Sequence, residues 1–348
     1  MKKWIFVGAL LSFFNGNAQD LESILLAAGD ANQLINQYIE PALKGLTYSV
    51  NGGWYTSAET HKKFGFDVTI AANAAFVPNK DKTFLFNPSD YTFLSAPSQN
   101  NENLPTVLGQ DGNSTMVDVR VPVGDGTFKI ASFEMPGGVA EDLPASGVLA
   151  PTIQVGFGLP TKTDIKLRLV PNLNYDDRVA ASLFGLGLQH DLSQYFPLME
   201  VSPLSLSVLG AFTTTKAEYE LLNDANTSNV NVINGVAEFK LNTWMVQAIA
   251  GVNLKIINFY ASAGYNSGNS TLKLLGDYTL SYDLEDENGS PLGTVSESLI
   301  DPININADTG GVRGTVGMRV NLSVFKLFAD FTLQEYNTVT AGIAVSVR

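Results

Sequence analysis

The closing stretch of the chain, Gly310 to Arg348, alternates apolar and polar residues with a period of two over three successive runs. In the first run, every even position from Val312 to Leu322 is apolar or Gly, whereas the odd positions carry Arg, Thr, Gly and Asn. Successive side chains of a strand point to opposite faces, so each run predicts a strand with one apolar and one polar face. The connections between the runs, at Val324–Lys326 and Glu335–Asn337, are short enough to predict an antiparallel meander.

The same alternation recurs along most of the chain. It predicts strands at Thr47–Thr56, at Gly65–Val77 and repeatedly from Val148 onward, with the least regular pattern between Pro78 and Gly147. A change of apolar parity between Leu241 and Trp244 predicts a β-bulge. Tight turns near 160–163, 254–257 and 324–326 alternate with longer connections near 223–231 and 283–310, an asymmetry typical of outer-membrane barrels. The strand count is about fourteen, or about twelve if the irregular third contributes fewer.

Composition supports an apolar exterior. Hydrophobic residues make up 45% of the chain and charged residues only 16%, against a usual charged share of about 25%. Beyond the N-terminus, no stretch approaches the ~18 consecutive apolar residues of a membrane helix, so the surplus is spread over alternating strands, as in a lipid-facing barrel. The formal net charge of −13 argues against a nucleic-acid partner, and the absence of cysteine excludes disulfides and thiolate metal sites.

The N-terminus has the pattern of a bacterial secretory signal. Lys2 and Lys3 precede an apolar run from Trp4 to Phe14 and small residues up to Ala18. We therefore expect a signal peptide at 1–18, a helical segment at 19–46 and a transmembrane barrel at 47–348.

The helical segment, Asp20 to Leu46, is amphipathic, and Pro41 is expected to break or kink it. Two placements fit its pattern: a cap packed on one end of the barrel, or a plug inserted in the lumen. For a hydrophobic cargo the apolar face of a plug would line the pocket. That face comprises Leu21, Ile24, Leu25, Leu34, Ile35 and Tyr38.

Ionisable residues on the polar faces of the strands are predicted to point into the lumen. They are Asp67, Asp118, Arg120, Asp164, Lys166, Arg168, Arg313, Arg319 and Asp330. Both signs occur, so mutual pairing that stiffens the wall and a wet lumen facing an anionic head group are both open. Arg168, Arg313, Arg319 and Asp330 are the lumen candidates.

Catalytic and metal chemistry finds little support. The chain has two histidines: His61 lies in the Ser57–Lys63 turn and His190 at a strand end, and neither has a second His with which to share a metal. His190 with Ser193 or Ser182 is a formal nucleophile pair, but a histidine at a strand end is more often structural. The acidic run from Asp283 to Glu287 lacks EF-hand spacing, and Asn288-Gly289 suits a hairpin tip in a solvated loop at Asp283–Asp308. We expect no enzyme, no metal and no cofactor.

This plan resembles the long-chain fatty-acid transporter (FadL-like) family of outer-membrane proteins. The shared features are a short N-terminal segment before the first strand, about fourteen strands and a mature length of about 330 residues. The chain lacks the family's Asn-Pro-Ala element, since its one Asn-Pro is Asn87-Pro88, and it ends Val345-Ser346-Val347-Arg348 without a terminal aromatic. It also resembles outer-membrane barrels of similar length from gliding and gut-type Gram-negative bacteria.

Three functions remain. The first is a channel or transporter in the outer membrane of a Gram-negative bacterium, with membrane lipid as its partner and a small hydrophobic or amphipathic molecule as its cargo. The second is a non-transporting adhesin or structural barrel that displays acidic outer loops. The third is a soluble secreted β protein, in which the apolar faces would be buried against one another. The sequence leaves the oligomeric state open.

Overall fold

The computed structural model describes residues 24–27, 29–98, 100–111, 115–123, 126–141, 143, 147–175, 179–200, 202–221, 230–285 and 291–347. The predicted signal peptide, Leu21 of the helical segment and the expected hairpin tip at Asn288-Gly289 lie outside these residues.

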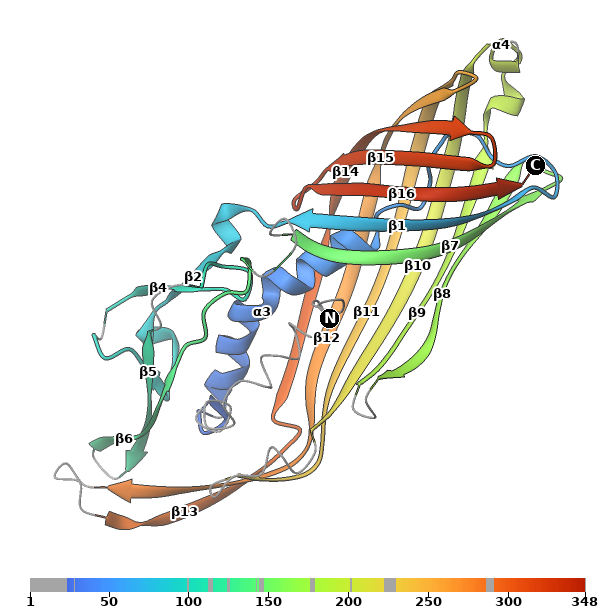
Figure 1. The fold of residues 1–348 in the computed structure, drawn as a ribbon. Coiled ribbons are helices and arrows are strands. Elements are labelled where there is room, and N and C mark those ends of the chain that lie inside the picture. Colours follow the sequence, from blue (N-terminus) through green and yellow to red (C-terminus); the bar gives the residue numbers. More distant parts are fainter. Residues whose placement is uncertain are drawn as a thin grey trace.

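Ten strands of the described chain form a closed antiparallel ring (Figure 1). They are β1 (Phe66–Phe76), β7 (Gly147–Leu159), β8 (Thr163–Tyr175), β9 (Val179–Asp191), β10 (Leu204–Leu221), β11 (Val230–Asn253), β12 (Ile257–Glu285), β14 (Ile303–Leu322), β15 (Phe325–Leu333) and β16 (Thr338–Val347). Each pairs with the ring strand before it, and β16 closes the ring on β1. The predicted up-and-down antiparallel barrel is confirmed, but its predicted count of about fourteen strands, or about twelve, is too high.

The surplus strands lie beside the ring. The irregular third forms β2 (Thr83–Phe86), β3 (Leu94–Ser95), β4 (Glu102–Pro105), β5 (Met116–Val123) and β6 (Gly126–Glu134) in two small sheets. β13 (Pro291–Ile300) pairs with the far end of β12, so the expected acidic loop is largely a hairpin. Local alternation predicts a strand but carries no information about which sheet it joins.

The predicted first strand, Thr47–Thr56, is not formed. Helix α3 (Gly29–Val50) takes up the first four residues of this stretch, residues 51–56 form no regular element, and the helix includes Pro41 without ending there. Leu43, Leu46 and Val50 fall at helical spacing and are buried. Their burial outweighs the one backbone hydrogen bond that proline removes, so helical periodicity prevails over the period-two pattern. Within the described residues, no helix combines the length and hydropathy needed to cross a membrane.

The long strands of the ring change their apolar face part-way along. In β14, Val312, Val316 and Met318 face outward and are exposed, whereas Ile303 and Ile305 face inward and are buried. In β11 the change falls between Leu241, which is buried, and Trp244, which is exposed. The register of β11 on both neighbours is continuous there, so the expected bulge at this point is wrong; the irregularity lies between Ile233 and Val236.

The changes of face fall on one row across four neighbouring strands. Phe212 pairs with Trp244, Trp244 with Ser267, and Ser267 with Gly310. On one side of this row the exterior is apolar, with Phe212, Trp244 and Tyr265 at its margin. The apolar exterior of β14 extends from Val312 to Leu322, which matches the roughly 9–11 residues that a tilted strand needs to cross a bilayer core.

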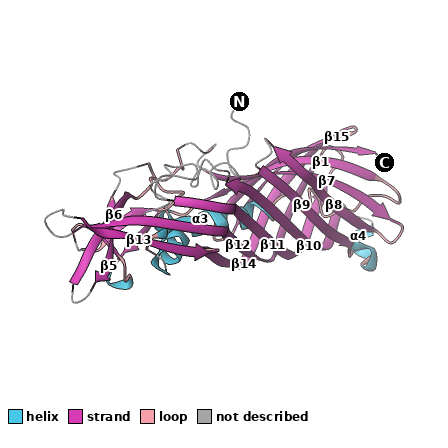
Figure 2. Cartoon of the chain, turned by 90° about the horizontal axis from the view of Figure 1, so that it is seen from below, coloured by secondary structure: helices cyan, strands magenta, loops and turns pink. Residues whose placement is uncertain are grey.

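Beyond this row, β10 to β14 continue as a one-sided wall, and α3 lies between that wall and β2–β6 (Figure 1). Leu34 and Leu43 of α3 share one buried apolar cluster with Leu272 of the wall and Phe133 of β6. Figure 2 shows β5, β6 and β13 at this extended end and the C-terminus at the opposite end of the ring. That opposite end, called the tight-turn end below, carries the short connections 160–162, 254–256 and 323–324.

The row predicts that a charged residue on the outer face of β14 destabilises the barrel on one side of the row and not on the other. Val316→Arg places a charge in the middle of the apolar exterior and should destabilise the bilayer-inserted barrel by about 2–4 kcal/mol. Asn306→Arg lies on the same strand face beyond the row, where Asn306 is exposed, and should change stability little. Folding free energies of the two variants in lipid vesicles check this, and equal effects would contradict a lipid-facing belt.

Candidate functional site

Residues 51–65, which connect α3 to β1, run through the lumen of the ring and are called the lumen segment. The segment begins at the end of α3, where Arg168 of β8 donates to Val50 O. It ends at the tight-turn end, where Phe64 N donates to Gly158 O at 2.8 Å. It is mostly buried, although it forms no regular secondary structure. Its residues are therefore held by wall side chains, and these contacts define the candidate site.

Two buried arginines hold the end of α3. Arg168 donates to Val50 O at 2.8 Å and to Gly52 O at 2.7 Å, and Arg313 of β14 donates to Asn51 O at 3.1 Å. The last carbonyls of a helix have no partner within the helix, and they carry its negative dipole end. The last turn of α3 has no basic residue of its own. The barrel wall supplies the C-terminal cap.

Trp54 fills a recess made by wall glycines. Its indole is fully buried, and the Arg168 guanidinium lies 3.9 Å from the ring centroid, in a cation–π contact. A Cβ atom at Gly187 of β9 would lie 2.9 Å from the indole, and one at Gly185 would lie 3.0 Å from it. The lumen face of β9 therefore lacks side chains where the indole lies against it.

Further along the segment, polar side chains of the wall bind it in succession. Tyr55 Oη donates to Gln247 Oε1 at 2.9 Å, and Gln189 Nε2 donates to Ser57 O at 2.9 Å. The Tyr55 ring also makes an edge contact with Tyr260, whose hydroxyl donates to Asp330 Oδ2 at 3.1 Å. Neutral hydrogen bonds thus hold the segment in the middle of the lumen, together with a small buried apolar cluster that Trp54, Tyr55 and Ala58 form with wall residues.

At the tight-turn end the segment is held by an imidazole between two carboxylates. His61 Nδ1 lies 2.9 Å from Asp164 Oδ2, and His61 Nε2 lies 3.6 Å from Asp67 Oδ2. The main-chain N–H of His61 also donates to Asp164 Oδ1. Burial lowers the pKa of His61, but the hydrogen bonds and charges of Asp164 and Asp67 raise it by more, so its pKa lies above the ordinary value of 6.5.

Glycines again make room here. A Cβ atom at Gly158 of β7 would lie 2.7 Å from the Cβ of His61, and one at Gly156 would lie 2.5 Å from Asp67 Oδ1. Gly156 N donates to that same carboxylate oxygen at 3.0 Å. The wall and the lumen segment are therefore complementary in shape at both ends of the segment.

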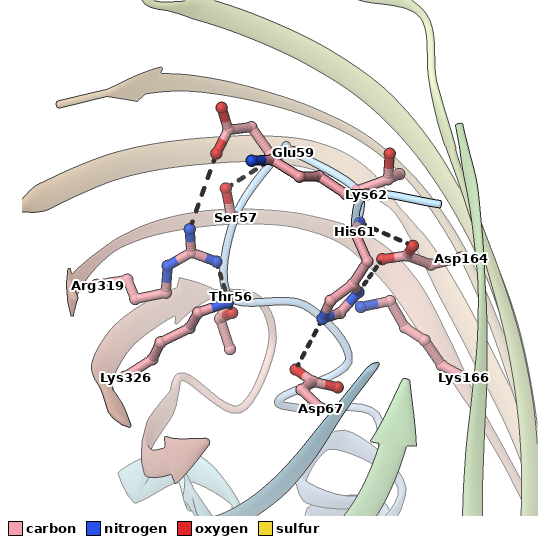
Figure 3. A pocket seen from close by; sticks show the side chains of 11 residues that line it. Thr56, Ser57, Glu59, His61, Lys62, Asp67, Asp164, Lys166, Arg319 and Lys326 are labelled. Atoms are coloured by element: carbon pink, nitrogen blue, oxygen red, sulfur yellow. Dashed lines mark hydrogen bonds and ion pairs between the residues drawn. The ribbon is translucent and has the colours of Figure 1, made fainter. Parts of the chain in front are cut away.

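A cavity of about 170 Å³ opens beside His61 at the tight-turn end (Figure 3). It is lined by Thr56, Ser57, Glu59, Thr60, His61, Lys62, Asp67, Asp164, Lys166, Arg319 and Lys326. Arg319 Nη1 donates to Thr56 Oγ1 at 3.3 Å, and its Nη2 lies 3.9 Å from a Glu59 carboxylate oxygen. Four cationic side chains and three carboxylates thus surround the cavity, together with His61.

The structure places the predicted candidates in two groups. Arg168, Arg313, Arg319 and Asp330 are all buried on the lumen face of the ring. The apolar candidates of the helical segment instead pack in the outer core around α3; they are Ile24, Leu25, Leu34, Ile35 and Tyr38. The functional roles of both groups stay predictions.

Two predicted lumen residues lie elsewhere. Asp118 and Arg120 belong to β5, outside the ring, where Lys129 Nζ lies 2.7 Å from Asp118 Oδ1. Alternation predicts a strand without showing which sheet the strand joins. For the same reason the predicted number of barrel strands was too high. His61, Lys166 and Lys326 were not singled out as a group, since only the course of residues 51–65 brings them together.

The formal nucleophile pair at His190 is not assembled. His190 Nδ1 hydrogen-bonds with Thr163 Oγ1 at 2.8 Å, and its Nε2 with Tyr195 Oη at 3.1 Å. Ser193 Oγ donates to Leu206 O instead, and Ser182 pairs with Lys216 in the ring. Among the described residues, no group of three or more His, Asp and Glu side chains could hold a metal ion.

Comparison with known proteins identifies a family. The sequence profile of a family of unknown function, DUF6588, matches residues 1–347. The chain belongs to this family. No curated protein matches the sequence, and no family-level match to the fatty-acid transporters accompanies the resemblance in plan.

Solved structures similar to the chain are outer-membrane β-barrels. The attachment invasion locus protein Ail of Yersinia pestis, solved with a heparin analogue, is 7% identical with a TM-score of 0.26, over 82% of this chain and 100% of that one. The NalP autotransporter translocator domain of Neisseria meningitidis is 12% identical, and a Pseudomonas aeruginosa FadL homologue 11%, with TM-scores of 0.23 and 0.20. Both matches cover 82% of this chain and 88% of the other. No binding activity transfers at this level of similarity.

The glycine recess yields a prediction about the wall. Gly187→Val places a branched side chain where the Trp54 indole lies, so the variant should lose about 1–3 kcal/mol of stability and alter Trp54 fluorescence. Gly210→Val on β10 is the matched control, because a Cβ atom there would have nothing within 4 Å. Denaturant unfolding with fluorescence detection compares the two, and equal losses would refute the recess.

The position of His61 yields a prediction about pH. Since its pKa is raised in the folded barrel, protonated His61 stabilises the fold fully below about pH 6.5, and this contribution disappears as pH rises through the raised pKa. Lys166 of β8 lines the same cavity, and the pKa of His61 is raised with that ammonium in place. The thermal midpoint of the wild type should therefore fall relative to that of His61→Gln between pH 6 and pH 9, as measured in detergent. If the thermal midpoints of the two proteins change with pH in parallel, protonation of His61 does not contribute to stability.

Proposed function

We propose that this protein is an outer-membrane channel that passes small hydrophobic or amphipathic solutes when its lumen segment moves aside. The closed ring and its apolar exterior support a place in a lipid bilayer, since a barrel leaves no unpaired strand edge in hydrocarbon. Phe212, Trp244 and Tyr265 lie at the margin of the belt, where aromatic side chains favour the membrane interface. The tight-turn end would face the periplasm and the extended end the exterior.

The mode of attachment of the lumen segment carries the proposal for transport. In the middle of the lumen the segment is bound by wall side chains, through contacts such as Tyr55 with Gln247 and Ser57 with Gln189. Polar groups of a lumen can exchange such partners for water, whereas a strand of the ring cannot leave without opening the sheet. The segment can therefore move while the barrel stays closed.

The extended end favours a second candidate function, a surface barrel without transport. An ordered body with a shared core lies beyond the apolar belt. It consists of the far ends of β10, β11, β12 and β14 together with β13, α3 and β2–β6. Such a body could bind a partner outside the cell. In this case the lumen segment would be a fixed part of the fold.

A disulfide distinguishes the two functions. The chain has no cysteine, and a Cβ atom at Gly251 of β11 would lie 3.2 Å from the Cβ of Ala58, near the 3.5–4.5 Å typical of disulfides. The double variant Ala58→Cys/Gly251→Cys should lose channel openings in planar bilayers when oxidised and recover them on reduction. Uptake of a small uncharged amphiphile into proteoliposomes should follow the same pattern.

Each single-cysteine variant is a control for the substitution itself, and its conductance should not respond to the redox state. If the oxidised and reduced double variants conduct and take up solute alike, the segment does not gate the lumen. The surface-barrel function would then be favoured.

A further inference from the structure

The cavity at the tight-turn end contains two lysines that have no direct ion pair and interact with Asp67 and Asp164 or Glu59 only at longer range. Lys166 is 5% exposed, yet its ammonium has no hydrogen bond and no carboxylate oxygen within 4 Å in the described part of the chain. Lys326 of β15 likewise has neither, and it is partly exposed. Burying an ammonium without a partner is costly, so a buried lysine of this kind calls for a ligand.

The carboxylates of the cavity make their direct hydrogen bonds and ion pairs with groups other than these two lysines. Asp164 accepts from the main chain of His61 and contacts its ring, and Asp67 accepts from Gly156 N and Thr69 Oγ1. Glu59 faces Arg319. The cationic side chains therefore outnumber the carboxylates around the cavity, in a protein whose formal net charge is −13.

The geometry suits a small anion. Figure 3 shows Lys166 and Lys326 entering the cavity from opposite sides, with Arg319 above Lys326. Glu59 and Lys62 are exposed at its rim, whereas Lys166 and Asp164 are buried. A volume of about 170 Å³ accommodates a compact head group. Lysine binds phosphate or carboxylate as a point charge, and arginine adds directed N–H donors.

We propose that this cavity binds a single oxyanion group, a carboxylate or a phosphate, between Lys166 and Lys326. The group belongs either to a free small anion or to the head of an amphipathic solute on its way through the lumen. In the second case the inference rests on the proposed function. Binding at this point would also neutralise charge beside His61, where the lumen segment is attached.

Calorimetric titration of the full chain in a nonionic detergent tests the proposal with three probes: inorganic phosphate, acetate and decanoate. Lys166→Gln and Lys326→Gln should each weaken binding about tenfold, which corresponds to about 1.4 kcal/mol, because each removes a charged hydrogen-bond donor to the anion. Lys166→Arg should retain binding. Lys273→Gln, on the outer face of β12 beyond the apolar belt, is the matched control and should bind as the wild type does.

The probes separate the two sources of the oxyanion. Binding of decanoate that competes with phosphate supports a solute head group, whereas binding of phosphate or acetate alone supports a free anion. The inference is overturned if none of the probes binds, or if the two glutamine variants bind as Lys273→Gln does. Lys326 is partly exposed, so Lys326→Gln keeps the test decisive even if Lys166→Gln fails to fold. Since binding is measured without conductance, this inference and the channel fail independently.

Discussion

A β-strand has two faces, and the structure follows from what each face meets at each level of the barrel. Between the tight-turn end and the row through Trp244 and Ser267, the outer strand faces are apolar and the charged side chains of the wall face the lumen. On the other side of the row the outer faces are polar and the inner faces are apolar. The reversal occurs without a break in register, so one continuous strand contributes to two environments. In a soluble sandwich, by contrast, an apolar face would be buried against a second sheet. Here Val316, Met318, Ile343 and Val345 face outward and are exposed.

The reversal also explains why the N-terminal region divides into two parts. α3 packs its apolar side chains where the inner faces of the long strands are apolar, and the chain loses regular structure where those faces become polar. At that level Arg168 and Arg313 cap the helix end with donors from the wall. The boundary between helix and lumen segment thus coincides with a change in the wall. The helical segment, for which the sequence offered a cap or a plug, packs beyond the belt around α3, whereas the residues that lie in the lumen, 51–65, belong to the predicted barrel.

Much of this arrangement could be predicted from the sequence, because strand faces are encoded by neighbours two residues apart. The outward positions of β14 to β16 and the lumen side of Arg168, Arg313, Arg319 and Asp330 follow from parity alone. Parity could not place Asp118, since β5 alternates as a ring strand does but pairs with β3 and β6. The change of apolar face between Leu241 and Trp244 predicted a bulge. A strand that passes from the membrane belt into the extended end gives the same sequence pattern without a bulge. The cavity beside His61 depends on the path of an irregular segment, for which no local periodicity exists.

The balance of forces along the N-terminal region locates the part of the barrel that can move. Burial of apolar side chains around α3 stabilises the fold by about 25 cal/mol per Å² of apolar surface. This free energy is lost when the side chains are exposed to water. The hydrogen bonds of residues 51–65 are exchanged for bonds to water on release, so each contributes only about 0.5–1.5 kcal/mol net. The segment is fixed at one end by the helix and at the other by Phe64, which bonds to the end of β7. The apolar cluster of the segment, Trp54, Tyr55 and Ala58 with five wall residues, is much smaller than the one around α3, so release costs least between these two anchors, in the stretch that fills the lumen.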